Sequence, residues 1–333
     1  MLCPMVVTQT ERPAIAQSNG HEVVVEVKDL VKQYGRGKSA FTAVKGVSFT
    51  VHPGEVFGFL GPNGAGKTTT ISILTTTLAP TSGRVTIADH DITTQASAVR
   101  RRVGIIFQNP SLDMNLTGEE NVRFHAILYG LFPYRPRFRM MPAAYRQQVM
   151  ELASLLDIET DIFRPIKVLS GGTRRKLEII RSLMHRPEVL FLDEPTRGLD
   201  TNGRRNLWNY LRTVQAAGTT VFLTTHYLEE AEGADSVCII NKGRVVAFGS
   251  PARIKAQSIR ESVVIDAEDR ARLRAELQTR GVAFSETPFF NVELTNGSAH
   301  QLLKVLETPL TMVRVHQPTL EEAYLSVLGN ADE

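Results

Sequence analysis

Two adjacent acids, Asp193 and Glu194, follow the apolar run Val189–Leu192. A continuous apolar run of this length is typical of a strand that is buried on both faces. Ligands of open α/β sheets bind at the carboxyl ends of the strands. Asp193 is therefore a candidate ligand of Mg²⁺, and Glu194 is a candidate base that orients and deprotonates a water attacking a phosphate.

A glycine-rich segment, Gly61–Thr68, fits the pattern G-x-x-x-x-G-K-[ST]. Backbone N–H groups of such a loop surround phosphate groups, while the lysine neutralises them and the final hydroxyl can hold Mg²⁺. The segment lies between a short apolar run, Glu55–Leu60, and a helix predicted from Lys67, whose N-terminus also favours anions. The pattern predicts that the chain binds ATP or GTP. It does not indicate which process the free energy of nucleotide hydrolysis would drive. The predicted phosphate-binding residues are Gly61, Pro62, Asn63, Gly64, Ala65, Gly66, Lys67, Thr68 and Thr69.

Gln108 and His226 each follow another predicted strand, so their side chains can converge on the same edge of the sheet. Gln108 could bind Mg²⁺ and sense the γ-phosphate, and His226 could hydrogen-bond that phosphate or the water. Alone, a histidine after a strand is more often an ordinary surface residue. Tyr34 is a candidate to stack on a purine ring, with a simple loop aromatic as the alternative.

The segment Leu169–Gly172 precedes a helix with an apolar stripe at helical spacing. Ser170 is predicted to cap this helix, which leaves backbone N–H groups unpaired near Gly171 and Gly172. Such a helix end binds anions, although in a monomer it would simply be a capped core helix.

Together these residues resemble the motifs of the ATPase subunit of ATP-binding cassette (ABC) transporters over roughly residues 23–250. The motifs occur in the order of that family: Walker A at Gly61–Thr68, the Q-loop at Gln108, the signature at Leu169–Gly172, Walker B at Val189–Asp193 followed by the base Glu194, the D-loop at Gly198–Asp200, and the switch histidine His226.

The resemblance implies roles that the spacing alone does not. Tyr34 would stack on adenine, and Lys67, Gln108, Glu194 and His226 would act in catalysis. The residues Ser170, Gly171, Gly172 and Asp200 would complete a site shared with a second copy of the chain. Two ATP molecules would then be sandwiched between two copies, with Thr68, Gln108 and Asp193 around the Mg²⁺.

Two residues depart from the family pattern. Thr173 stands where the family most often has glutamine, and Thr201 stands where it usually has proline. Thr173 keeps a hydroxyl group but has less reach towards a ribose or a partner surface. Neither change removes the helix end, the base or the metal ligands, so we expect ATPase activity.

Two apolar runs, Val237–Ile240 and Arg244–Phe248, are predicted to form a hairpin across Asn241–Gly243, where the glycine accepts a positive φ.

The order of predicted strands and helices indicates an α/β fold. By resemblance it is a P-loop NTPase cassette of the ABC type, with a RecA-like core, an antiparallel β subdomain and a helical subdomain. The helical subdomain is expected at about 109–168, where Thr117-x-x-Glu120 is a capping-box pattern. We expect a disordered leader at 1–20, the ATPase domain at 21–255 and a small C-terminal α+β accessory domain at 256–333.

Composition limits the class of protein. The formal net charge is +3, which is too small to argue for a nucleic-acid partner. Cys3 and Cys238 have no metal-site spacing, and two cysteines fit a reduced, intracellular setting. No apolar run approaches the roughly 20 residues that cross a bilayer, so a membrane role would depend on a partner.

Two segments, Thr224–Ala231 and Gln317–Gly329, are similar to the drug- and antibiotic-resistance exporter ATPases. The resulting hypothesis is an ATP- and Mg²⁺-dependent subunit that energises export of drug, antibiotic or lipid-like cargo. It would work through a separate transmembrane permease, on the cytoplasmic side of the membrane and without direct contact to nucleic acid. The cargo itself would be selected by the permease.

The alternative is a soluble ABC ATPase that acts on ribosomes or nucleic acid. Soluble members of the translation type usually carry two cassettes in one chain, whereas this chain has one set of motifs. Repair-type members separate Walker A from the signature by a long coiled coil, but the intervening residues 69–168 contain no heptads. A P-loop enzyme outside the ABC family would need a second substrate site, and the motifs show none.

Overall fold

The computed structural model describes residues 22–107, 111–197, 199–258, 262–294, 299–316 and 319–331. Gln108, Gly198 and the predicted leader lie outside the described residues. No helix in these ranges is long and apolar enough to cross a bilayer.

A mixed sheet lies at the centre of the molecule, with the strand order β10-β9-β3-β8-β7-β6. Its bounds are Arg244–Gly249, Ser236–Asn241, Val56–Leu60, Thr220–Thr225, Val189–Asp193 and Val103–Ile106, in that order. The strands from β9 to β6 are parallel, and β10 pairs antiparallel with β9 as the predicted hairpin. Every residue of β3, β7 and β8 is buried, as expected for strands covered on both faces.

A second, antiparallel sheet packs beside the central one, with the order β2-β1-β4-β5. The bounds are Phe41–Val51, Val25–Tyr34, Ser82–Ile87 and His90–Asp91. Phe49 of β2 stacks on Phe57 of β3, with ring centroids 5.5 Å apart, and also contacts Phe222 of β8. This aromatic cluster joins the two sheets into one core.

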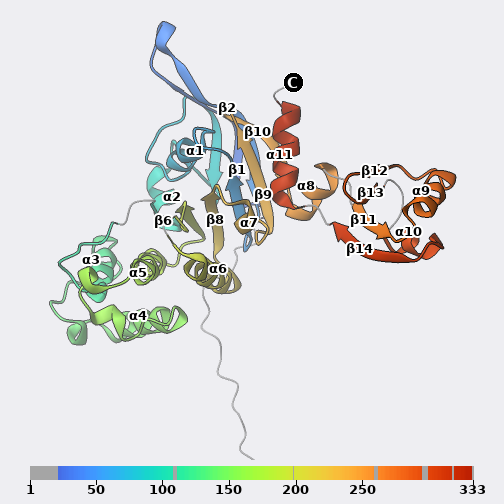
Figure 1. Ribbon diagram of the computed structural model, residues 1–333. Coiled ribbons are helices and arrows are strands. Elements are labelled where there is room, and N and C mark those ends of the chain that lie inside the picture. Colours follow the sequence, from blue (N-terminus) through green and yellow to red (C-terminus); the bar gives the residue numbers. More distant parts are fainter. Residues whose placement is uncertain are drawn as a thin grey trace, which may run out of the picture.

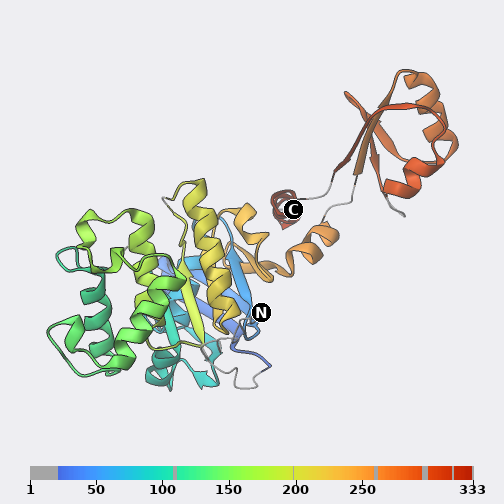
Figure 2. The same ribbon diagram turned by 90° about the horizontal axis from the view of Figure 1, so that it is seen from below.

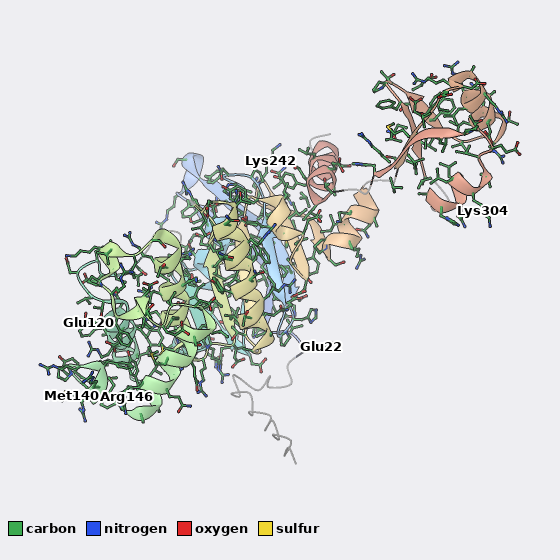
Figure 3. The ribbon with its side chains drawn as sticks, turned by 60° about the horizontal axis from the view of Figure 1, so that its bottom comes forward. Glu22, Glu120, Met140, Arg146, Lys242 and Lys304 are labelled. Atoms are coloured by element: carbon green, nitrogen blue, oxygen red, sulfur yellow. The ribbon has the colours of Figure 1, made fainter. Side chains whose placement is uncertain are left out.

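Helices flank both sheets: α1 (Lys67–Leu74), α2 (Ala96–Arg102) and α6 (Thr201–Ala216). A separate helical subdomain contains α3 (Gly118–Leu128), α4 (Ala143–Leu155) and α5 (Gly171–Leu183), with short 3-10 turns at Phe138–Met140, Asp161–Phe163 and Ile166–Val168. It forms the green part of Figure 1, and Figure 3 marks its outer part with Glu120, Met140 and Arg146. Thr117 and Glu120 form the predicted capping box at the start of α3.

The chain leaves the central sheet through α8 (Pro251–Ser258) and forms a small domain with its own core (Figure 2). Its sheet has the order β12-β13-β11-β14, with bounds Phe284–Glu286, Phe290–Glu293, Ser262–Ala267 and Leu310–His316. Two helices, α9 (Arg270–Thr279) and α10 (Ala299–Val305), complete it. The sequence analysis did not predict β12.

The last helix, α11 (Leu320–Ala331), returns to the ATPase domain instead of packing on the small sheet (Figure 1). Leu320 and Ala323 are fully buried in the same core as the central sheet, and Tyr324 packs against it. The accessory domain was expected at 256–333, but α11 within that range packs on the core of the ATPase domain. The apolar face of α11 finds its partners on α8, β10 and α7 (Leu228–Ala231).

Candidate active site

The glycine-rich loop connects β3 to α1, and two of its glycines have no room for a side chain. A Cβ on Gly61 would lie 2.2 Å from the carbonyl oxygen of Ile240. Gly66 has φ +109°, and a Cβ there would lie 2.7 Å from the carbonyl oxygen of Ala43. The motif glycines are therefore required by close backbone packing as well as by the turn.

The turn of the β9–β10 hairpin supports this loop. Gly243 N–H donates to the carbonyl of Ala65 at 3.0 Å, and the carbonyl of Gly243 accepts from Lys45 N–H at 2.8 Å. Gly243 has φ +82°, and a Cβ would lie 2.7 Å from the carbonyl oxygen of Ala43. Lys242, labelled in Figure 3, marks the position of the turn. The sequence predicted the turn glycine but not its contact with the loop.

Lys67 is buried, and its side chain is folded into the loop. Its Nζ donates to the carbonyls of Gly61 at 2.6 Å and Pro62 at 3.2 Å. Burial lowers the pKa of Lys67, while the carboxylates of Glu194 and Asp193 oppose this shift. The ammonium group can exchange its carbonyl partners for phosphate oxygens, which would compensate its charge more fully.

Asp193 ends β7 beside the first turn of α1. Its Oδ1 accepts a 2.6 Å hydrogen bond from the hydroxyl of Thr224, the residue paired with it on β8. Burial raises the pKa of Asp193, and this hydrogen bond opposes the shift. Asp193 and Thr68 line one pocket. A carboxylate and a hydroxyl are oxygen ligands of the kind Mg²⁺ prefers, and the cation would offset the cost of the buried carboxylate. The residues present therefore fit Mg²⁺.

Glu194 follows with φ +44°, an uncommon conformation for a residue with a side chain. Its N–H donates to the hydroxyl of Thr224 at 2.9 Å, so one threonine holds the backbone of Glu194 and the side chain of Asp193. Thr224 was not predicted as a site residue, although it lies near the end of the next predicted strand along the chain and Asp193 follows the one before it. Strained backbone that is held in this way often occurs at functional sites.

His226, one residue beyond β8, lies next to Glu194. The distance from His226 Nδ1 to Glu194 Oε1 is 3.6 Å, and the histidine side chain is 38% exposed. The carboxylate of Glu194 is also 3.8 Å from Arg197 Nη1. This geometry places a candidate base and a candidate hydrogen-bond donor at neighbouring strand ends, as the sequence predicted they could lie.

Tyr34 ends β1 and lies beside the glycine-rich loop. Its hydroxyl is 3.5 Å from the hydroxyl of Thr69. The ring is 42% exposed, and the ammonium of Lys32 is 5.4 Å from its centroid. An exposed aromatic ring next to the phosphate loop is suitable for stacking on a base.

Gln108 lies outside the described residues, but the residues on both sides of its segment are attached to α5. Arg175 Nη1 donates to the carbonyl of Phe107 at 2.9 Å, and Ser111 N–H donates to Glu178 Oε1 at 3.0 Å. Arg175 and Glu178 are themselves a buried ion pair at 2.8 Å. The sequence did not predict the role of this pair, because its two members lie far from Gln108 in the chain.

Ser170 caps α5, since its hydroxyl oxygen accepts from Thr173 N–H at 3.1 Å. The hydroxyl of Thr173 is 3.0 Å from that of Ser170. Asp200 caps α6 by accepting from Gly203 N–H at 2.8 Å. Figure 1 shows α5 with α3 and α4, away from α1. The structure thus gathers Tyr34, the glycine-rich loop, Asp193, Glu194 and His226, whereas α5, the helix that Ser170 caps, lies with the helical subdomain.

These features define a P-loop ATPase of the cassette type. Residues 44–197 match the ABC transporter family model. The chain is 34% identical to daunorubicin resistance ATP-binding protein DrrA3 of Streptomyces coeruleorubidus, over 93% of this chain and 97% of that protein. It is 36% identical to Nod factor export ATP-binding protein I of Ralstonia nicotianae, over 93% and 95% of the two chains.

A solved dimeric structure of the ATP-binding cassette MJ0796, in a post-hydrolysis state with ADP and phosphate, superposes with a TM-score of 0.59. The match has 27% identity and covers 68% of this chain and 98% of that one. The chain belongs to the ATP-binding proteins of the ABC transporter family, and it is an ABC ATPase.

Proposed function

We propose that this chain is the energising subunit of an exporter. It would hydrolyse ATP with Mg²⁺ and drive drug, antibiotic or lipid-like cargo through a separate transmembrane permease. The observation that carries this proposal is similarity along almost the whole chain, accessory domain included, to a daunorubicin resistance protein and a Nod factor export protein. The first name describes resistance to a drug, and the second describes export of a product.

The site supports the following division of chemical roles. Lys67 and the loop N–H groups bind the phosphates, and Thr68 and Asp193 hold the metal. Bound Mg²⁺ supplies neutralisation of phosphate charge. Glu194 orients the attacking water and accepts its proton, and His226 hydrogen-bonds the γ-phosphate or that water. Tyr34 stacks on the adenine.

The separation of the two motif groups supports an ATP-sandwich dimer as the working form. The capped end of α5 carries unpaired N–H groups and lies apart from the chain's own phosphate loop. Ser170, Gly171 and Gly172 would contact the γ-phosphate bound by a second copy, and Asp200 would lie at the same seam. Each copy would then supply one half of each of the two nucleotide sites.

The permease contact is proposed near residues 111–116, where the helical subdomain begins. Met114 is exposed there, and Ser111 is fastened to α5 through Glu178 and Arg181. A permease that contacts this segment would therefore sense movement of the signature helix. The chain would be held on the cytoplasmic side of the membrane by this contact.

Affinity purification of the tagged chain from its own cells tests the function. We expect co-purification of a multi-span membrane protein encoded next to its gene, and loss of cargo export when Glu194 is replaced by glutamine. Co-sedimentation with ribosomes, with no membrane protein bound and export unchanged, would favour the alternative of a ribosome-associated ABC ATPase.

A further inference from the structure

The short helix α7 lies between the switch histidine and the C-terminal helix. It begins at Leu228, two residues after His226, and Ala231 is fully buried in the main core. On its other side α7 packs against α11. Figure 1 shows α11 alongside α8 at the edge of the ATPase domain. A shift of α11 would therefore reach α7 directly.

Glu230 fixes α7 to the catalytic strands. Its buried Oε2 accepts from the hydroxyl of Thr196 at 3.0 Å and from that of Thr225 at 2.9 Å. Thr196 lies two residues after Glu194, and Thr225 directly precedes His226. A buried carboxylate is costly unless it is hydrogen-bonded, so this pair of contacts holds α7 in one position relative to both catalytic segments.

Glu232, directly after α7, contacts both segments that lead to the accessory domain. Its Oε1 accepts from Leu320 N–H at 2.8 Å, in the first turn of α11, and its Oε2 lies 3.2 Å from Lys255 Nζ on α8. The pair with Lys255 is partly exposed and contributes little. The bond to the helix terminus satisfies a backbone group that has no partner within α11, and Leu320 itself is fully buried.

We infer that α11 positions His226 for ATP hydrolysis through α7, with Glu232 as the positioning residue. The sheet domain at residues 262–316 is inserted between α8 and α11, so it can change turnover without touching the nucleotide. This inference rests on the proposed role of His226 in hydrolysis.

The test compares full-length variants by ATP turnover, KM for ATP and melting temperature. Glu232→Ala is expected to lower kcat about three- to tenfold, the value of one hydrogen bond, while KM stays within about twofold. Glu232→Gln keeps an acceptor for Leu320 N–H and should restore most of kcat. Glu321→Ala removes an exposed acid from the first turn of α11, next to Leu320, and serves as the matched control. We expect wild-type kcat for this variant.

A double variant separates positioning from general stability. In a His226→Ala background, Glu232→Ala should have no further effect on the residual turnover, because the group it positions is gone. The inference would be overturned if the reductions in kcat from the two substitutions multiply in the double variant. An unchanged kcat in Glu232→Ala alone would also overturn it. If His226→Ala keeps wild-type turnover, the proposed role of His226 fails. If His226→Ala loses turnover but Glu232→Ala does not, only the role of α11 fails.

Discussion

The two halves of the proposed nucleotide site are built in opposite ways. The phosphate loop, Asp193 and Glu194 stand at the ends of β3 and β7, in which every residue is buried. Ser170 and Gly171, in contrast, are exposed at the start of α5. The first half is held in place within one chain, whereas the second half remains accessible. The difference is what a shared site requires, because only an open helix end can close on a nucleotide held by another copy.

The largest effect should come from the buried half. Glu194→Gln keeps the shape of the side chain but removes the base, so turnover should fall at least about 100-fold while ATP binding persists. ATP-bound dimers should accumulate, as measured by size-exclusion chromatography with ATP. Glu151→Gln, on the surface of α4, is the matched control. Wild-type turnover of Glu194→Gln would contradict the assignment of the base.

Lys67→Ala should weaken ATP binding by about 10- to 100-fold, since it removes a charged donor to the phosphates. Calorimetric titration of ATP measures this directly, without turnover. The fold should survive because the bonds that Lys67 Nζ makes to residues the structure describes go to two carbonyls of its own loop. An unchanged affinity for ATP would remove Lys67 from the phosphate site.

The exposed half can be tested by mixing two variants with impaired turnover. Ser170→Ala should lower turnover about tenfold and leave ATP affinity nearly unchanged, because the chain's own phosphate loop is intact. Mixed with Glu194→Gln, it forms dimers in which one site has both a base and an intact signature. Turnover should therefore rise above that of either variant alone. If Ser170 instead serves the ATP of its own chain, the mixture will show no gain.

The smallest effect concerns stability. Burial raises the pKa of Asp193, so its ionised form is less favourable in the folded chain than in the unfolded chain. The contribution of Asp193 to the free energy of unfolding therefore falls as the pH rises from its ordinary pKa in the unfolded chain to its raised pKa in the folded chain. Asp193→Asn can still accept from Thr224, so the nucleotide-free protein should melt about 1–2 °C higher at pH 7.

The same variant should lose the stabilisation that Mg²⁺ and ATP together give the wild type. Differential scanning calorimetry with and without Mg²⁺ and ATP measures both effects. A nucleotide-free Asp193→Asn that melts below the wild type would show that the carboxylate stabilises the fold, contrary to the direction of its pKa shift.

The sequence predicted the elements that depend on local patterns. The apolar run before Asp193 is a buried strand, the Thr117–Glu120 capping box is formed, and Ser170 caps α5. These features depend on neighbours within a few residues, so spacing reveals them. The hairpin around Gly243 was predicted for the same reason, but its contact with Ala65 was not. That contact joins two turns distant in the chain.

The sequence by itself determined the chemistry of this protein, because a phosphate loop, two acids and a capped glycine turn need specific residue types at specific spacings. Tertiary structure decided how those residues are supported. Thr224 holds Asp193 and Glu194 from the next strand. Arg175 and Glu178 hydrogen-bond Phe107 and Ser111, and α11 leaves the accessory domain to pack beside α7. Each of these contacts joins segments far apart in the chain, and burial of apolar surface, not local propensity, brings them together.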